Sequence, residues 1–504
     1  MKKASVLKRS TAAGLLAITV SGCVSAEQAA LYSDPQAGFT KVNSTTAAAT
    51  AGKQTVWIQN QQQTQQNNAR VKSLVNRKTI NADTAVQIAL FNNKGLQASY
   101  AELGMSAADA WQQTMLENPV MSVGLLGVGA PELGVYRAIE ATIATNIVAL
   151  TTQKRRVAAA DVRFRQAQYA AVGETLRLAV DTRRAWIDAV SAQENVRYLE
   201  KAQLSANAAA ELGQKLGDTG ALPKGEQARE QAFYAEISGQ LAEAKLSARL
   251  AKEQLTRLMG LWGADISYQL PERLPSLPPK ATDRSRIEAE ALRNRVDLKV
   301  AKLELEALAA SYKLTEATRY VSDLELVLGA EAEREIETEY ELSGDEIEEK
   351  STKKTVVTPQ IEIDFAIPIF DTGKARMRKA ELAYLQAANR LAEKAVNVRS
   401  EARSAYTAYR STYDIATHYR NTVIPLRTEV EKESLLTYNG MITNTFELLA
   451  DIRSKMGAIL MASNAKREFW LAEANLSASV FGGGAGSAQP TGGATLADAG
   501  GGPH

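Results

Sequence analysis

The stretch Leu324-Glu325-Leu326-Val327-Leu328-Gly329-Ala330-Glu331-Ala332 decides the fold class. Its aliphatic side chains occupy every second position, and the positions between them hold glutamates, a valine and a glycine. Because successive side chains of a strand point to opposite faces, this spacing predicts a strand with one apolar and one polar face. A run of this length and alternation is typical of a strand that crosses a membrane. A soluble two-sided hairpin would alternate in the same way, so both interpretations stay open at this point.

Three further runs alternate similarly. We expect four strands in all, over about 119–129, 136–147, 323–341 and 355–370. Four strands cannot close a barrel, so several chains would have to pool their strands. Acidic side chains occupy polar positions of the later strand pair. The candidate lumen acids are Glu325, Glu331, Glu333, Glu362 and Asp364.

Glutamates continue at every second position from Glu331 to Glu341. If this run is a strand facing a pore, its ladder of carboxylates would favour cations. It could instead be a solvated external loop or a short charged helix, with Lys350, Lys353 and Lys354 balancing the charge. The sequence of 331–354 is compatible with each of these interpretations.

An internal repeat organises the chain around these strands. Residues 89–96 resemble residues 291–298 at a separation of 202, and the separation then becomes 220, as between Lys154 and Lys374. The second repeat therefore carries 18 additional residues, which fall between positions 298 and 374. We expect repeat 1 over 79–280 and repeat 2 over 281–481.

After its strands, each repeat predicts a hairpin of two long helices, over 151–262 and 372–481. Helix-forming residues dominate these segments, and only Pro425 could kink the second one. The first helix of each hairpin would be roughly 100 Å long. At the two turns, Gly220 and Gly440 are expected to supply a left-handed helix C-cap. A free-standing coiled coil would explain the helices but would leave the strands without a purpose.

The chain begins with a basic segment and a short apolar run, which predict a signal peptide over 1–22. This N-terminal segment ends in Val20-Ser21-Gly22-Cys23, which is similar to the bacterial lipoprotein box. Cys23 is therefore the expected site of lipidation, including attachment of palmitate. The polar residues 23–78 are interpreted as a lipidated tether with little core of its own. The Gly-rich residues 482–504 are expected to be disordered.

The composition excludes most familiar kinds of catalytic and metal-binding site. The chain has one Cys and two His, which leaves no Cys/His metal site and no Cys–His nucleophile pair. The formal net charge of +2 gives no reason to expect a nucleic-acid partner. We predict neither catalytic residues nor cofactors, so the protein is not expected to be an enzyme.

Several segments together resemble the TolC-type outer membrane factor family, the outer membrane efflux lipoproteins. One is the strand-to-helix junction Ile367-Pro368-Ile369-Phe370-Asp371-Thr372-Gly373-Lys374, and another is the helix opening Arg295-Val296-Asp297-Leu298. The hairpin-tip segment 440–450 is also similar to that family. The resemblance spans roughly residues 80–481.

The resemblance implies a fold that is mainly α with transmembrane β. Three identical chains would form a 12-stranded barrel, four strands from each, continued by a long α-helical periplasmic barrel. It also implies an outer membrane location, a periplasmic adaptor protein and an inner-membrane pump. The hairpin tips would contact the adaptor through Gly220, Leu222, Gly440 and Ile442. The candidate gate residues are Phe446, Glu447, Leu449 and Asp451, either as a ring of acids or as an apolar constriction.

We therefore expect a passive, trimeric efflux duct that passes substrate from the pump and adaptor to the outside. The acidic ladder favours heavy-metal or cation cargo, while drug or protein export stays open. The alternative is a periplasmic coiled-coil lipoprotein without a pore, which would leave the alternating runs unexplained.

Overall fold

The computed structural model describes residues 26–482 apart from 77, 130–135, 221, 322, 344–345, 441 and 444. The predicted signal peptide, Cys23 and the tail from 483 lie outside the described residues. The chain divides into two compact units. Unit 1 comprises Met1–Ala37, Leu103–Ala167 and Ala301–Arg390, and unit 2 comprises Gly38–Glu102, Gln168–Val300 and Leu391–His504.

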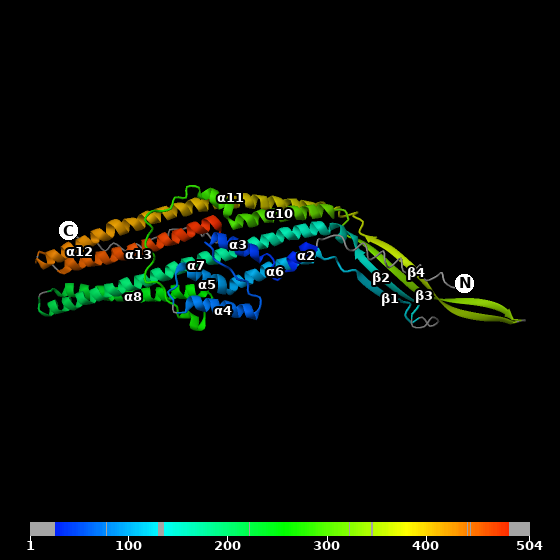
Figure 1. The fold of residues 1–504 in the computed structure, drawn as a ribbon, viewed down its shortest axis with the longest axis horizontal. Helices are drawn as coiled ribbons and strands as arrows, with labels where there is room; N and C mark the ends of the chain where they lie inside the picture. Colours follow the sequence, from blue (N-terminus) through cyan, green and yellow to red (C-terminus); the bar gives the residue numbers. More distant parts are fainter. Residues whose placement is uncertain are drawn as a thin grey trace. The chain divides into compact units, whose positions relative to one another are not determined.

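Unit 1 contains a four-stranded sheet in the order β1-β2-β3-β4, with every neighbouring pair antiparallel (Figure 1). The strands are β1 (Val120–Leu126), β2 (Ala138–Asn146), β3 (Leu324–Ser343) and β4 (Glu346–Phe365). The mainly helical fold with four strands per chain, predicted from the alternating runs and the repeat, is confirmed.

The second hairpin is longer than the sequence pattern suggested. Pairing between β3 and β4 continues without a break to Ser343 and Glu346, so the described part of 331–354 is strand. β4 starts before the expected position 355 and ends at Phe365 rather than at 370, close to Pro368, which has no N–H to donate. The additional residues of repeat 2 thus lengthen this hairpin.

Helices complete unit 1. They are α2 (Ala26–Ser33) and parts of α6 (Lys94–Thr114), α7 (Ile147–Asp218), α10 (Val296–Ala317) and α11 (Lys374–His418). α2 is held on α7, because the Tyr32 ring meets Phe164 edge-on at 5.4 Å and the Tyr32 hydroxyl donates to Asp161 Oδ1 at 2.9 Å.

Unit 2 consists of helices and takes in the rest of α6, α7, α10 and α11. Its other elements are α3 (Phe39–Ala49), α4 (Gln61–Val75), α5 (Ala82–Asn92), α8 (Lys224–Leu258), the short 3₁₀ turn η1 (Gly263–Ile266), α9 (Ile287–Asn294), the π-helical turn η2 (Tyr419–Val423), α12 (Ile424–Asn439) and α13 (Thr445–Phe481). The two predicted helix hairpins are α7 with α8, and α11, η2 and α12 with α13.

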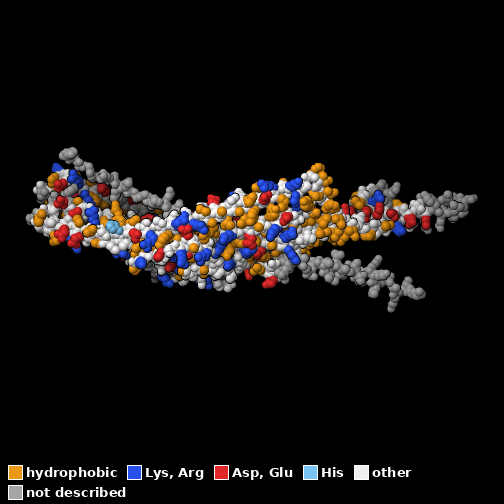
Figure 2. Space-filling model, turned by 90° about the horizontal axis from the view of Figure 1, so that it is seen from above, with side chains coloured by type: hydrophobic (Ala, Val, Ile, Leu, Met, Phe, Trp, Pro, Cys, Tyr) orange, Lys and Arg blue, Asp and Glu red, His pale blue; other side chains and the backbone are white. Residues whose placement is uncertain are grey.

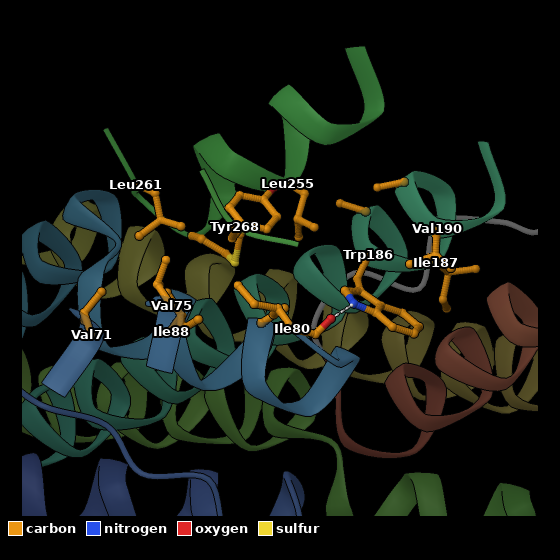
Figure 3. Packing of buried hydrophobic residues seen from close by; sticks show 14 of the residues in the cluster. Val71, Val75, Ile80, Ile88, Trp186, Ile187, Val190, Leu255, Leu261 and Tyr268 are labelled. Atoms are coloured by element: carbon orange, nitrogen blue, oxygen red, sulfur yellow. Dashed lines mark hydrogen bonds between the residues drawn. The ribbon is translucent and has the colours of Figure 1, made fainter. Parts of the chain in front are cut away.

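The core of unit 2 corrects the expectation of a polar tether over 23–78. Val71 and Val75 of α4 are buried in the same cluster as Trp186 of α7 and Leu255 of α8 (Figure 3). The Trp186 indole N–H donates to the Ile80 carbonyl at 2.8 Å, the dashed line in Figure 3. The Gln/Asn-rich composition concealed a helix that places its few apolar residues on one buried side.

Candidate functional site

The sheet has one apolar face. The register of the strand pairs places sixteen side chains on it: Met121, Val123 and Leu125 of β1, Ile139, Ala141 and Ile143 of β2, Leu324, Leu326, Leu328, Ala330 and Ala332 of β3, and Val357, Pro359, Ile361, Ile363 and Phe365 of β4. Many are exposed, with Ile361 at 76% and Met121 at 68%. Figure 2 shows hydrophobic side chains gathered over part of the sheet. An exposed apolar area that spans four strands needs a lipid or protein covering.

The opposite face of the sheet is polar and acidic. All five predicted lumen acids lie on it, together with Glu140, Thr142, Asn146 and Gln360. Glu325 lies directly opposite Asp364, and Glu140 lies directly opposite Glu331. Like charges that face each other across strands are destabilising unless water solvates them. This face is therefore suited to a water-filled space.

Two of these acids have polar partners. Gln360 donates from Nε2 to Glu331 Oε2 at 3.3 Å, and Arg137 pairs through Nη2 with Glu333 Oε1 at 2.6 Å. Beyond Glu333 the glutamates continue along the same face, where the register sets Glu335 opposite Lys354. The ladder is therefore strand in its described part and a continuation of the acidic face.

The sheet is open at both sides. β1 pairs only with β2, and β4 pairs only with β3, among the strands that the structure describes. Both outer strands consequently present unpaired backbone N–H and C=O groups, which are ready to pair with another chain.

The two hairpin tips differ in backbone geometry. Gly220 has φ 76°, and the Leu222 N–H donates to the Leu216 carbonyl at 3.1 Å, so the predicted left-handed cap is present at the first tip. Gly440 has φ −78°, so the same prediction is wrong at the second tip. There the helix ends with the Gly440 N–H donating to the Leu436 carbonyl at 2.9 Å, a bond that needs no left-handed residue.

Three of the four predicted adaptor residues are exposed at the tips, namely Gly220, Gly440 and Ile442. Ile442 is 81% exposed, and the Leu222 side chain is half-buried. Of the candidate gate residues, Glu447 accepts a hydrogen bond from the Thr443 hydroxyl, and Asp451 accepts one from the Ser434 hydroxyl. Leu449 is half-buried, and the side chain of Phe446 lies outside the described residues. Asp451 thereby ties α13 to α12.

An ion pair near the tips was missed at the sequence level. Arg453 of α13 donates from Nη2 to Glu230 Oε2 of α8 at 2.9 Å, and its guanidinium lies 4.0 Å from the centre of the Phe233 ring. Glu230 is buried. The pair joins a helix of repeat 1 to one of repeat 2. Two residues so distant in sequence carry no local pattern that predicts their contact.

The opening motif of repeat 2 forms an ionic cluster around the buried Arg295. Arg295 holds the Asp297 carboxylate with two hydrogen bonds of 2.9 and 2.8 Å and also pairs with Glu401 of α11. Burial by itself would raise the pKa of Asp297, but the hydrogen bonds and charge of Arg295 outweigh it and hold that pKa below its usual value. The motif fixes the junction of α9 and α10 against α11.

Unit 2 also contains a half-open pocket of about 180 Å³. Lys53, Arg183 and Glu473 are its charged lining residues, beside apolar groups such as Leu176 and Phe481. Burial raises the pKa of Glu473, against the opposing charges of Arg183 and Arg284. A lining with both charge signs selects no ligand class.

The matches to known proteins agree with this geometry. Residues 289–450 match the family model described as outer membrane efflux protein. Over these residues, about a third of the chain, the protein is similar to outer membrane efflux proteins. The matched segment covers most of repeat 2, including β3, β4 and the second hairpin tip.

Solved outer membrane channels share the fold of this chain. The Campylobacter jejuni CmeC channel aligns with 18% identity and a TM-score of 0.63, covering 80% of this chain and 86% of CmeC. VceC from Vibrio cholerae aligns with 17% identity and a TM-score of 0.61, covering 83% and 98%. MtrE from Neisseria gonorrhoeae, an outer membrane channel in its open state, aligns with 16% identity and a TM-score of 0.55, covering 79% and 88%. A sequence search of curated proteins found no match.

Two searches of the described residues gave no candidates. None of their helices is long and apolar enough to cross a membrane. No group of three or more His, Cys, Asp or Glu side chains in this part of the chain could hold a metal ion.

Proposed function

We propose that the protein is a passive, homotrimeric duct of the bacterial outer membrane through which an efflux system expels its cargo. The observation that carries this proposal is the two-faced sheet, apolar across all four strands on one side and acidic along β2, β3 and β4 on the other. Lipid covers the first face and water fills the space along the second, which is the arrangement of a transmembrane barrel wall.

Three chains complete the wall. The unpaired outer edges of β1 and β4 leave each sheet open, and a barrel is the arrangement that removes such edges. If β4 of each chain pairs with β1 of the next, three four-stranded sheets close into a 12-stranded barrel. The family and the fold of the related channels support this arrangement.

The partners are a periplasmic adaptor and an inner-membrane pump, which supplies the energy. We assign adaptor contact to the hairpin tips, with Ile442 as the most exposed apolar candidate beside Gly220, Leu222 and Gly440. At the second tip, Glu447 and Leu449 are the best-placed gate candidates, while the hydrogen bond of Asp451 to Ser434 gives it a structural task as well. The domain plan proposed for this assembly is the pair of repeats, 79–280 and 281–481.

The cargo class that the polar face fits best is a cation. Carboxylates along a water-filled wall raise the local concentration of cations and lower that of anions. Heavy-metal ions are one such cargo. The chain would serve as their passage and not as their binding site, since ions must leave such a wall as readily as they enter it.

Cys23 is proposed as the lipid attachment site, which would anchor the chain in the outer membrane. The test is fatty-acid labelling of the wild-type protein and of Cys23→Ser in growing cells. Labelling that is absent only from the variant supports the anchor, and equal labelling of both proteins excludes it.

The decisive experiment images the detergent-extracted protein by electron microscopy and records its conductance in planar bilayers. Three-fold particles that conduct ions support the duct. The competing function is a periplasmic coiled-coil scaffold, and it predicts rods without three-fold symmetry and no conductance. That result would also leave the apolar face of the sheet without lipid to cover it.

A further inference from the structure

Three basic residues stand at one margin of the apolar face. Ala332 of β3 ends the unbroken run of apolar residues on this face, and Arg334 follows it two positions later, on the same side of the strand. The Arg334 N–H donates to the Arg137 carbonyl at 2.9 Å, which sets Arg137 beside it ahead of β2. Lys353 of β4 lies opposite Ile336, again on the apolar side. We call Arg137, Arg334 and Lys353 the margin cluster.

An aromatic ring accompanies the cluster. The guanidinium carbon of Arg334 lies 4.1 Å from the centre of the Tyr136 ring, and Arg334 Nη2 donates to the Tyr136 hydroxyl at 2.8 Å. Tyr136 and Arg334 are both half-buried, whereas Lys353 is exposed and has no ion pair within the described residues. Arg137 pairs with Glu333, so Lys353 is the exposed cation of the cluster, beside the Arg334 guanidinium.

The depth of the cluster follows from the proposed function, on which this inference rests. The apolar run of β3 from Leu324 to Ala332 has the length that a tilted strand needs to cross the hydrocarbon layer. The margin cluster comes directly after that run, on the side of the turn between β3 and β4. Its side chains therefore lie at the depth of the lipid headgroups, where tyrosines and basic residues gather in membrane proteins.

We infer that the margin cluster binds the phosphate group of an anionic lipid headgroup in the leaflet nearest that turn. A guanidinium donates two parallel hydrogen bonds to phosphate oxygens, and a nearby ammonium adds a point charge. The lumen acids face the other side of the sheet and do not compete for these cations, apart from Glu333. In a trimer the site occurs three times around the barrel.

The sheet contains its own control residue. Lys354 is adjacent to Lys353 in sequence but points to the opposite, acidic face, where the register sets it across from Glu335. Replacing either lysine by Gln removes the same charge from the same strand. Only the change at Lys353 should affect a lipid that covers the apolar face.

The experiment compares wild type, Lys353→Gln, the double variant Arg334→Gln/Lys353→Gln, and Lys354→Gln. Each protein is reconstituted in phosphatidylcholine vesicles that contain lipid A, a lipid with phosphate groups on its sugars, and the lipid A retained per trimer after gentle extraction is measured by native mass spectrometry. We expect Lys353→Gln to weaken retention about fivefold and the double variant about thirtyfold. Lys354→Gln should retain as much as wild type.

Equal retention by all four proteins, or an equal loss in Lys354→Gln, would overturn the inference. Complete displacement of lipid A by millimolar inorganic phosphate would also overturn it, because the site would then be one for free phosphate. Conductance in pure phosphatidylcholine bilayers tests the proposed duct independently of lipid A binding. A wild type that inserts and conducts but retains no lipid A leaves the duct intact, whereas failure to insert refutes the duct.

Discussion

Arg295 is the residue on which the repeat-2 junction depends. Its side chain is nearly buried, and it satisfies carboxylates on two different helices. The change Arg295→Met keeps most of the volume and removes the charge, so Asp297 and Glu401 are left partly buried without their partner. We expect a loss of about 2 kcal/mol, less than for a fully buried pair because both acids keep some contact with water. Thermal unfolding in detergent, followed by circular dichroism, measures it.

The same cluster predicts a pH dependence. The pKa of Asp297 is lower in the folded chain than in the unfolded one, so the unfolded state takes up its proton first as the pH falls. This contribution to stability is complete above the unfolded pKa and is lost as the pH falls through the folded one. In Arg295→Met the contribution is missing at neutral pH, so the gap in melting temperature between wild type and variant should narrow in acid. A gap that stays constant from neutral to strongly acidic pH would contradict this account.

The two tip glycines predict opposite outcomes for the same substitution. Gly220 has a positive φ, and an alanine there would be strained by about 1 kcal/mol. Gly440 has an ordinary φ, and a Cβ built on it would come no closer than 3.4 Å, to the Leu436 carbonyl oxygen. We expect Gly220→Ala to lower the melting temperature and Gly440→Ala to leave it nearly unchanged. Equal effects would mean that the two tips share one geometry.

This pair also marks a limit of sequence reasoning at the residue level. The repeat aligns Gly220 with Gly440, and a glycine after a long helix predicts a left-handed cap at both. A glycine permits that conformation but does not require it, since it is also compatible with negative φ. The following segment decides, and it differs, because Pro223 precedes α8 whereas no proline follows Gly440 before α13.

At the level of elements, contact between lipid and the apolar face of the sheet can be tested with two single variants of β4. One places an arginine on the apolar face and the other places it on the polar face. Ile361 lies near the middle of the apolar run, so Ile361→Arg should oppose insertion by about 2 to 4 kcal/mol per chain. Thr358→Arg places the same side chain on the polar face, opposite Glu331, and should insert normally. The fraction of protein recovered in vesicles after refolding measures both. Normal insertion of Ile361→Arg would show that lipid does not cover the apolar face.

The elements were predictable where one periodicity held without ambiguity. Alternation located all four strands, and runs of helix-forming residues located both hairpins. Strand ends were less predictable, since alternating charges in 331–354 are compatible with strand and with solvated loop, and only continued backbone pairing decided for strand. α4 was missed because Val71 and Val75 are few among glutamines and asparagines, and their burial depends on partners in α7 and α8.

Across the whole molecule, the acidic face predicts ion selectivity. Neutralising Glu325→Gln, Glu362→Gln and Asp364→Asn together removes three acids of that face from each chain, nine from a trimer. We expect the reversal potential in a potassium chloride gradient to move toward zero. Glu304→Gln, an exposed change on α10, is the control and should leave it unmoved. An unchanged reversal potential in the triple variant would show that these acids do not line the lumen.

The register of the sheet also dictates the order in which the chain can assemble. β3 and β4 are neighbours in sequence, with Ser343 paired to Glu346, so this hairpin can form within microseconds. β2 must instead find β3 across the whole first helix hairpin, as the pairing of Ala138 with Glu333 requires. Closing so long a loop costs entropy before any contact offsets it. β1 and β2 can therefore join β3 only after the later β3–β4 hairpin has been made, and until then their apolar side chains need protection from aggregation.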